Sequence, residues 1–594
     1  MKVKKRDEID NQYKWRLEDI YSSDQVWSDD IKKAKELSDL LIDFKGKLNN
    51  DKKSIFDCLN LNSKVGYILE KLYVYARMRL DQDVTVTKYK EMVSKVESLS
   101  VNIDAKTAFI LPELSANDEE FLLSLSKDKD FEKYSYSLEL IVKRKKHTLS
   151  TKEETLLAKM GKFTSLFKES FSMLDNADIK FEDFVNDKGE VVALSHGIYG
   201  LYLQTGSREE RKKAFESMFN AYKQNINLIT TLYKGNVEKN AFYANVRGYK
   251  SCLDRATSNE DVPSEVYERL IKNIHLNLPY LHDYMRYRKE ELKYDELHMY
   301  DLHMPLVEDV TETIEYNQAK QMVLEALAPL GKDYNELLQK AFNEGWIDVY
   351  ENKGKRSGAY SWGCYGTHPY VLLNYQPVLN DVFTIAHELG HAMHTYFSNE
   401  NQPMEKAGYE IFVAEVASTV NETLLVMHLL KTATGNYRKY LLSYLLNMFR
   451  TTVFRQSQFA EFEYKAHTMA ENEEPITTDS LCNMYYDLNK QYYGEDVVND
   501  ELIRYEWARI PHFYTAFYVY KYSTGLISAV CIACDILEKG EQAVKDYKKF
   551  LSAGGSMSPV EILKLVGVDL TTDAPYTKAM NFFKHTLEEI KLTK

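Results

Sequence analysis

Apolar residues recur at helical spacing along most of the chain. In residues 31–46 they return every three or four positions, which predicts an amphipathic helix. Residues 207–222 open on Ser207 and place Glu210 three positions later, the pattern of a capping box at a helix start. Strand patterns are rare and short; they cover residues 190–194, 302–307 and 369–375. We therefore expect a mainly α protein with a small β-sheet.

The chain has 594 residues but only 24 Gly and 12 Pro, both below average usage. This composition favours a few large helical lobes over many small domains. We expect a helical N-terminal region over residues 1–110, a helical lobe over 111–185, and one large region over 186–594.

One predicted helix, near residues 381–397, contains the run His387-Glu388-Leu389-Gly390-His391. Positions i and i+4 share one face of a helix, so both histidines can bind a single metal ion, and tetrahedral zinc suits them. Glu388 can act as general base on a water at that metal. Gly390 weakens a helix interior, so we expect another element to approach closely there.

A catalytic zinc ion needs a third protein ligand, and the next predicted helix, residues 409–422, offers one. This helix is apolar nearly all round, which indicates burial. Glu415 lies in its most apolar part and is the expected ligand, whereas Glu410 and Glu422 lie nearer its ends. Polar residues one and two turns further on could orient the histidines: Ser418, Asn421 and Glu422.

The pentapeptide and the run from Phe412 to Ser418 resemble the thimet oligopeptidase family of zinc metallopeptidases and, within it, the oligoendopeptidase F group. Further blocks are similar in the same order: 13–21, 358–361, 368–375 and 510–525. The resemblance implies one zinc ion bound by His387, His391 and Glu415, with Glu388 as the base. It also implies a large multi-lobed helical metallopeptidase in which residues 186–594 are the catalytic domain. The site would lie in a deep central channel that admits short peptides.

A tyrosine-rich block follows some 120 residues after the zinc motif. Between residues 512 and 522 it supplies one histidine and four tyrosines, which are donors suited to a developing oxyanion. The resemblance implies that His512 faces the substrate, and it aligns Tyr520 with the second of two catalytic tyrosines. Phe517 stands where the first would be, so either Tyr514 or Tyr518 replaces it, or one hydroxyl acts alone. Which tyrosine faces the zinc is left open among four: Tyr514, Tyr518, Tyr520 and Tyr522.

The strand predicted at 369–375 lies just before the zinc helix. An edge strand beside the metal could pair with the backbone of a peptide, which gives affinity without demanding a sequence. Upstream glycines indicate a loop near the site that could act as a lid: Gly354, Gly358, Gly363 and Gly366.

Charge and cysteine content narrow the setting. The net charge of −13 disfavours a nucleic-acid partner, which usually needs a basic face. The start of the chain lacks the apolar core of a signal peptide, and the longest apolar run, 525–537, is too short to span a bilayer. Six cysteines do not make a disulfide scaffold, and Cys531 and Cys534 fit core packing. We expect a cytoplasmic protein without a membrane partner.

The leading hypothesis is a zinc endopeptidase that acts on short oligopeptides. A zinc carboxypeptidase or dipeptidyl carboxypeptidase is an alternative; it needs a cation to bind the substrate C-terminus, and Arg356, Arg504 and Arg509 are available. A non-catalytic peptide-binding protein with structural zinc is a third, but such a site has no use for a base at Glu388.

Overall fold

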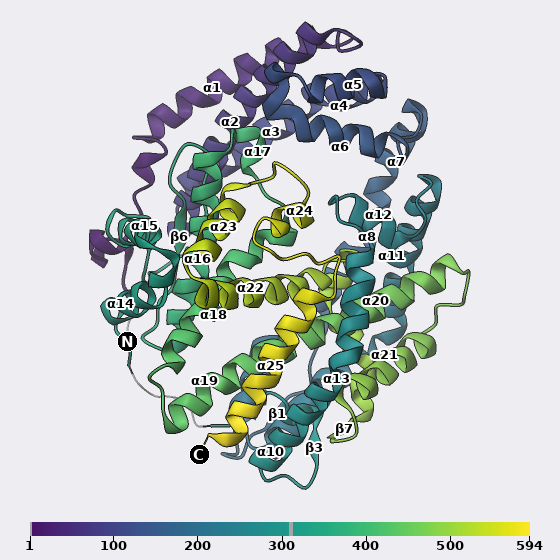
Figure 1. Cartoon of the computed structure of the whole chain (residues 1–594). Coiled ribbons are helices and arrows are strands. Elements are labelled where there is room, and N and C mark those ends of the chain that lie inside the picture. Colours follow the sequence, from purple (N-terminus) through teal and green to yellow (C-terminus); the bar gives the residue numbers. More distant parts are fainter. Residues whose placement is uncertain (1–2, 308–312, 594) are drawn as a thin grey trace. The chain divides into compact units, whose positions relative to one another are not determined.

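A computed structural model describes residues 3–307 and 313–593, and helices make up most of them (Figure 1). Strands in the described residues are confined to three small sheets, which confirms the predicted mainly α fold. The chain forms two compact units, each built from three chain segments. Unit 1 comprises 1–148, 311–429 and 532–568; unit 2 comprises 149–310, 430–531 and 569–594. The domains expected from the sequence are continuous ranges with boundaries at 110 and 185, whereas each unit here combines three separate segments. Those boundaries therefore stay a prediction.

Unit 1 contains the zinc-motif helix, α16 (Leu379–Asn401), and the following helix α18 (Ile411–Leu430), so both predicted site helices exist. The pattern over 31–46 belongs to α1 (Asp24–Leu41), which starts earlier than expected because Ser23 caps it. The other helices of unit 1 are α2 (Lys52–Gln82), α3 (Thr87–Thr107), α4 (Ile110–Ala116), α5 (Glu119–Ser126), α6 (Ser135–Lys145), α14 (Tyr316–Ala326), α15 (Lys332–Asn343), α17 (Met404–Ala407), α23 (Glu541–Ser552) and α24 (Pro559–Lys564).

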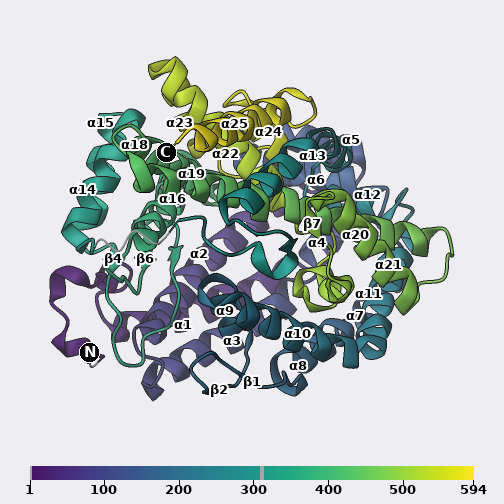
Figure 2. The same cartoon turned by 90° about the horizontal axis from the view of Figure 1, so that it is seen from below.

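A three-stranded sheet lies against α16 through its strands β5 and β6, and Figure 2 shows β6 beside that helix. Its order is β4 (Ile347–Asp348), β6 (Tyr370–Leu372), β5 (Tyr360–Trp362), with β4 parallel and β5 antiparallel to β6. The strand predicted at 369–375 is therefore present, but it is the central strand and not an edge. Its residues are buried and apolar, which is the pattern of a strand paired on both sides.

The two edges of this sheet differ. Beside β4 the N-terminal segment makes backbone hydrogen bonds, from Val349 N to Tyr13 O (3.0 Å) and from Arg16 N to Gly345 O (2.6 Å). The side chain of Arg6 also pairs with the buried carboxylate of Asp348. No strand in the described residues pairs with the outer side of β5. The sheet thus keeps one backbone edge available, and it is the edge next to α16.

Unit 2 is also helical, and the predicted capping box at Ser207 and Glu210 opens α10 (Arg208–Gln224). Its other helices include α13 (Glu265–Glu291), α20 (Arg455–Glu471) and α21 (Thr478–Tyr493), which pack together. The remaining ones are α7 (Thr151–Thr164), α8 (Leu166–Met173), α9 (His196–Thr205), α11 (Ile226–Val246), α12 (Cys252–Ser258), α19 (Gly435–Met448) and α25 (Ala574–Leu592). The apolar run 525–537 lies in α22 (Tyr520–Lys539), which the two units share, and it is largely buried, as predicted.

The strands of unit 2 fit the sequence only in part. The prediction at 190–194 corresponds to β2 (Val191–Val192), paired with β1 (Phe184–Val185). The prediction at 302–307 is wrong: β3 (Leu297–His298) comes earlier and pairs with β7 (Val497–Val498). The chain instead turns at Asp301, whose buried carboxylate binds Arg211 (2.7 Å) and the backbone N–H of His298 (3.1 Å). Pro305, which has no N–H to donate, follows in the predicted strand.

By length and composition, α18 alone among the described helices would also suit a membrane span. However, 56% of its apolar window is buried inside the protein, as in the core helix of a globular fold. Its apolar surface is explained by packing, and the helix carries the acidic residues described next.

Candidate metal centre and catalytic residues

The two motif histidines of α16, His387 and His391, direct their Nε2 atoms toward the same point. Their Nε2 atoms lie 3.2 Å apart, and the ring centroids are 4.8 Å apart. Helical spacing places both side chains on one face, so no unusual backbone is needed to bring the nitrogens together.

Glu415, on α18, completes a triangle with these nitrogens. Its Oε2 lies 3.5 Å from Nε2 of His387 and 3.4 Å from Nε2 of His391. Ligands held about 2.0–2.1 Å from a tetrahedral zinc ion are about 3.3 Å from each other. The three observed separations match that value, so the triad fits the metal that its donor types suggest. In the described part of the chain it is the one such group of histidine, cysteine and carboxylate ligands.

Acidic partners keep the triad in a charged state. Burial by itself would lower the pKa of His387, but the hydrogen bonds with Glu415 and Glu422 outweigh it and raise the pKa to about 10. Hydrogen bonds from His387 and His391 hold the pKa of Glu415 well below its usual range. Glu415 is therefore ionised at neutral pH, and its negative charge suits a divalent cation.

Glu388 lies beside the triad in a different environment. Its side chain is only 7% exposed, and burial raises its pKa above the ordinary glutamate value. Such a carboxylate is a better proton acceptor than an exposed one, as the role of general base requires.

The polar residues expected to orient the histidines behave unequally. Glu422 Oε1 lies 2.5 Å from Nδ1 of His387, so it fixes that ring, as predicted. Asn421 instead donates to the backbone carbonyl of Ala386 (3.0 Å), which ties α18 to α16. The hydroxyl of Ser418 donates to the backbone carbonyl of Glu415 (2.9 Å) and lies 3.4 Å from Oε2 of the same residue, so it contacts the proposed third ligand and no histidine in the described contacts.

Gly390 has the role expected from the sequence. A Cβ atom built there would lie 2.5 Å from Cα of Ser418 and 2.6 Å from the carbonyl oxygen of Ala417. These are backbone atoms of α18 and cannot rotate away. The glycine therefore allows the close helix contact that brings Glu415 to the two histidines.

The tyrosine-rich block belongs to unit 2 and begins in η11 (Pro511–Tyr514). His512 is exposed to solvent, and two of the four tyrosines lie beside it. Its ring stacks with Tyr518 at 5.8 Å between centroids, and its Nε2 lies 3.4 Å from the hydroxyl of Tyr522. Partial burial of the imidazole and the nearby Lys168 lower the pKa of His512, which favours the neutral imidazole at pH 7.

Tyr520 and Tyr514 lie apart from this cluster. Tyr520 is 1% exposed and packs on Tyr267 at 4.9 Å between centroids. Tyr514 is also buried and stacks on Phe171 at 4.4 Å. Tyr520 stays the tyrosine predicted from the alignment, but the side chains beside His512 are the ring of Tyr518 and the hydroxyl of Tyr522.

Phe517 bends the backbone between these residues. It has a φ of 54°, in the left-handed region that non-glycine residues seldom adopt. Its N–H donates to Oε1 of Glu463 (2.8 Å), a carboxylate that is fully buried on α20. Glu463 was not predicted from the sequence, although a charged residue in the apolar part of a helical pattern is a signal of such a role.

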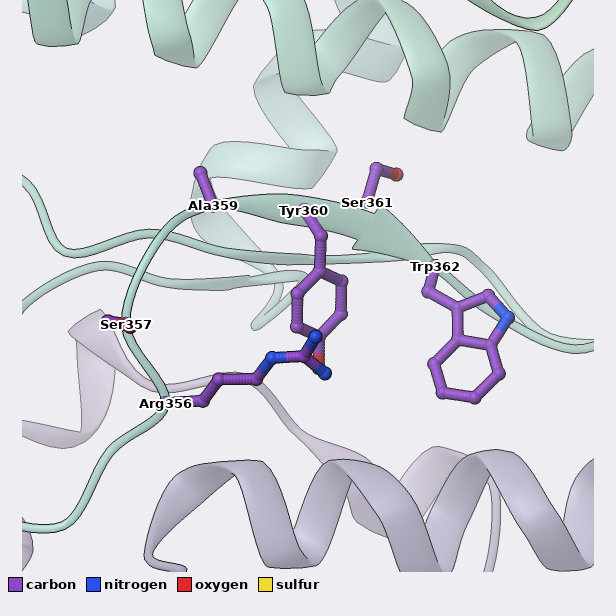
Figure 3. Close-up of a pocket in the computed structure, with 6 residues that line it drawn as sticks. All are labelled: Arg356, Ser357, Ala359, Tyr360, Ser361 and Trp362. Carbon is purple, nitrogen blue, oxygen red and sulfur yellow. The ribbon is translucent and has the colours of Figure 1, made fainter. Parts of the chain in front are cut away.

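A pocket of about 290 Å³ lies along β5 and the turn before it. Figure 3 shows Tyr360 and Trp362 on one side of the strand and Ala359 and Ser361 on the other. Arg356 lies over the ring of Tyr360 (5.5 Å) and pairs with Asp81, yet its side chain stays 48% exposed. The glycine-rich loop is anchored here, because Asn374 donates to the carbonyls of Arg356 and Gly358.

Comparisons with known proteins agree with this centre. The profile of peptidase family M3 matches residues 201–582, and one described as Oligopeptidase F matches 113–181. Oligopeptidase PepF of Bacillus subtilis is 42% identical over 99% of this chain and 88% of its own length. Group B oligopeptidase PepB of Streptococcus agalactiae is 38% identical over 99% and 98%.

Solved structures give the same result. A protein from Chlamydophila abortus has a TM-score of 0.92 at 34% identity and covers 99% of both chains. The oligoendopeptidase-F of Enterococcus faecium has a TM-score of 0.75 at 33% identity, covering 96% of this chain and 98% of that one.

A helical fold with a His-His-Glu centre and a buried glutamate beside it defines a metallopeptidase. The chain belongs to peptidase family M3, and it is a metalloendopeptidase. The predicted resemblance to oligoendopeptidase F is confirmed. This result favours the endopeptidase over both alternatives drawn from the sequence.

Proposed function

We propose that this protein is a zinc endopeptidase that cleaves internal bonds of short peptides in the cytoplasm. One zinc ion is bound by His387, His391 and Glu415. The observation that carries the proposal is the ligand triangle, whose sides of 3.2, 3.4 and 3.5 Å suit tetrahedral zinc. The relatives named oligopeptidases support peptides as substrates. Six cysteines without a disulfide support a reducing compartment.

A zinc ion held by these three residues would supply Lewis-acid chemistry, which would acidify a water molecule and polarise a peptide carbonyl. Glu388 takes the proton from the attacking water, and its raised pKa suits that task. The same carboxyl then gives the proton to the leaving amine. Glu422 holds the His387 ring so that Nε2 stays available as a ligand.

His512 and one tyrosine of its block are proposed to donate hydrogen bonds to the carbonyl oxygen as negative charge develops on it. This role rests on the family match, which includes these residues. Tyr520 is the residue that the alignment favours. Its burial argues for Tyr518 or Tyr522 as the donor that reaches a substrate, because a donor must contact the reacting oxygen.

The outer side of β5 is proposed to pair with the backbone of the peptide. It is the free edge of the sheet and lies beside α16. Backbone pairing would bind many sequences with similar affinity, as a peptidase for mixed oligopeptides requires.

The direct test is digestion of a random peptide library with and without a chelator, followed by mass spectrometry. We expect cuts at internal bonds, complete loss with chelator, and recovery on adding zinc. Cuts confined to the C-terminal end would instead favour a carboxypeptidase, with Arg356 as a candidate for binding the terminal carboxylate. Activity that survives full metal removal would contradict the proposal.

A further inference from the structure

Four arginines converge in unit 2. They come from α13, the π-helical turn η9 (Phe449–Phe454), the first residue of α20, and the end of η10 (Glu501–Arg509). All four lie close enough to one another to act electrostatically on His303. The four residues are Arg288, Arg450, Arg455 and Arg509.

Arg288 and Arg450 are joined through neutral groups. The guanidinium of Arg288 donates to the hydroxyl of Tyr284 (3.3 Å), which donates to Oδ1 of Asn447 (3.2 Å). Nε of Arg450 donates to the same oxygen (3.3 Å). The two cations are therefore neighbours, linked by one tyrosine and one asparagine.

Neither of these two arginines has a carboxylate partner among the described residues. Arg288 also donates to the backbone carbonyl of Met304 (2.5 Å), and Arg450 bonds with the phenol of Tyr493. Yet Arg288 is 0% exposed and Arg450 only 2%. A buried charge normally needs an opposite charge, because water is no longer present to solvate it.

The nearby carboxylate, that of Glu506, already has other partners. Glu506 pairs with Arg455 and accepts a hydrogen bond from Tyr485 (2.5 Å). Arg509 shares the same carboxylate at longer range and lies over the ring of Tyr199 at 5.6 Å. In the described part of this cluster, one carboxylate thus faces four guanidinium groups.

We propose that Arg288 and Arg450 form a binding site for a small inorganic anion of chloride or phosphate type. Tyr493 supplies a further polar group, and Arg509 adds positive potential. The near-complete enclosure of both arginines favours a free compact anion over a side chain of a partner. Arg450 lies in a π-helical turn, an irregularity that is frequent at functional sites. Anion binding here does not depend on the proposed peptidase chemistry.

The test is thermal unfolding of the zinc-loaded full chain at constant ionic strength, with gluconate replaced stepwise by chloride or by phosphate. A specific anion that binds the folded state raises Tm in a saturable way. We expect this for the wild type, and for Arg450→Gln a saturation midpoint at least about tenfold higher. Arg286→Gln is the matched control, because it removes an exposed arginine from the same helix as Arg288.

A second measurement does not depend on how well the variants fold. Crystals of the wild type soaked in sodium bromide should show an anomalous peak in contact with both Arg288 and Arg450. The proposal would be overturned by the absence of such a peak or by equal anion responses in the wild type and Arg450→Gln. It would also be overturned if the anions only compete with peptides that have a free C-terminus and not with amidated ones. That result would assign the site to a substrate carboxylate.

Discussion

Two groups of residues show two ways in which a sequence encodes chemistry. The first, the metal block of unit 1, comprises His387, His391 and Glu415; the second, the tyrosine block of unit 2, comprises residues 512–522. The proposed metal ligands lie on regular helices, where spacing alone fixes which side chains share a face. The tyrosines lie around a left-handed residue, Phe517, after which the usual helical or extended register no longer applies. For a motif on a regular helix, the sequence therefore predicts the individual functional residues. For a motif that crosses an irregular turn, it predicts the segment but not which residue in it acts.

The largest difference between the blocks should appear in a tyrosine-to-phenylalanine series. Tyr518→Phe or Tyr522→Phe should lower kcat by about 10²–10³-fold with little change in KM, because a hydrogen bond made only in the transition state is lost. Tyr520→Phe should stay close to the wild type, since its side chain is buried and its ring packs on Tyr267. Steady-state kinetics on one internally quenched peptide measures all three. A large kcat loss in Tyr520→Phe alone would restore the assignment from the alignment.

The metal block should lose activity when the close contact between Gly390 and the backbone of α18 is disturbed. Gly390→Ala forces a Cβ atom against α18, so Glu415 must move away from the histidines. We expect about 100-fold lower kcat/KM and weaker zinc binding, together with about 1–3 kcal/mol lower stability. Gly200→Ala in α9 is the matched control, since no atom lies within 4 Å of its new Cβ. Equal behaviour of the two variants would show that the helix contact is unimportant.

A smaller effect is expected one step away from the metal. Glu422→Gln removes the charge that orients His387 and should weaken zinc binding by about 10–100-fold. Glu410→Gln, an exposed glutamate near the start of the same helix, should have no effect. Competition with a chelating dye measures both affinities. If the two variants bind zinc equally well, Glu422 does not position the ligand.

Proton linkage gives the finest distinction. In the metal-free protein His387 has a pKa of about 10, so it is protonated at neutral pH and must lose that proton to bind zinc. Apparent zinc affinity should therefore rise with pH, by up to about tenfold per unit, until pH approaches 10. Calorimetry in buffers of different ionisation enthalpy counts the released protons. Affinity that is flat between pH 6 and 8 would contradict the raised pKa.

Much of the metal block could be predicted from the sequence. Helical spacing identified His387 and His391, and burial identified Glu415. The loss of propensity at Gly390 indicated a close helix contact, which the structure confirms. These features depend on local spacing and on general rules of burial.

The features that could not be predicted depend on distant contacts. The strand at 370–372 becomes central because the segments before it pair on both of its sides. The strand predicted at 302–307 is replaced by a turn because Asp301 binds arginine and backbone donors. Likewise, the bend at Phe517 depends on Glu463, which is more than 50 residues away in the sequence.

The central claim is that Glu388 moves the proton while three other residues hold the metal. Glu388→Gln keeps the size of the side chain and removes its basicity. Zinc content by mass spectrometry, measured on the same sample as peptidase kcat, tests this claim most directly. We predict about one zinc ion per chain, as in the wild type, with kcat lowered by at least about 10²–10⁴-fold. Wild-type rates at full zinc occupancy, or loss of the zinc itself, would contradict it.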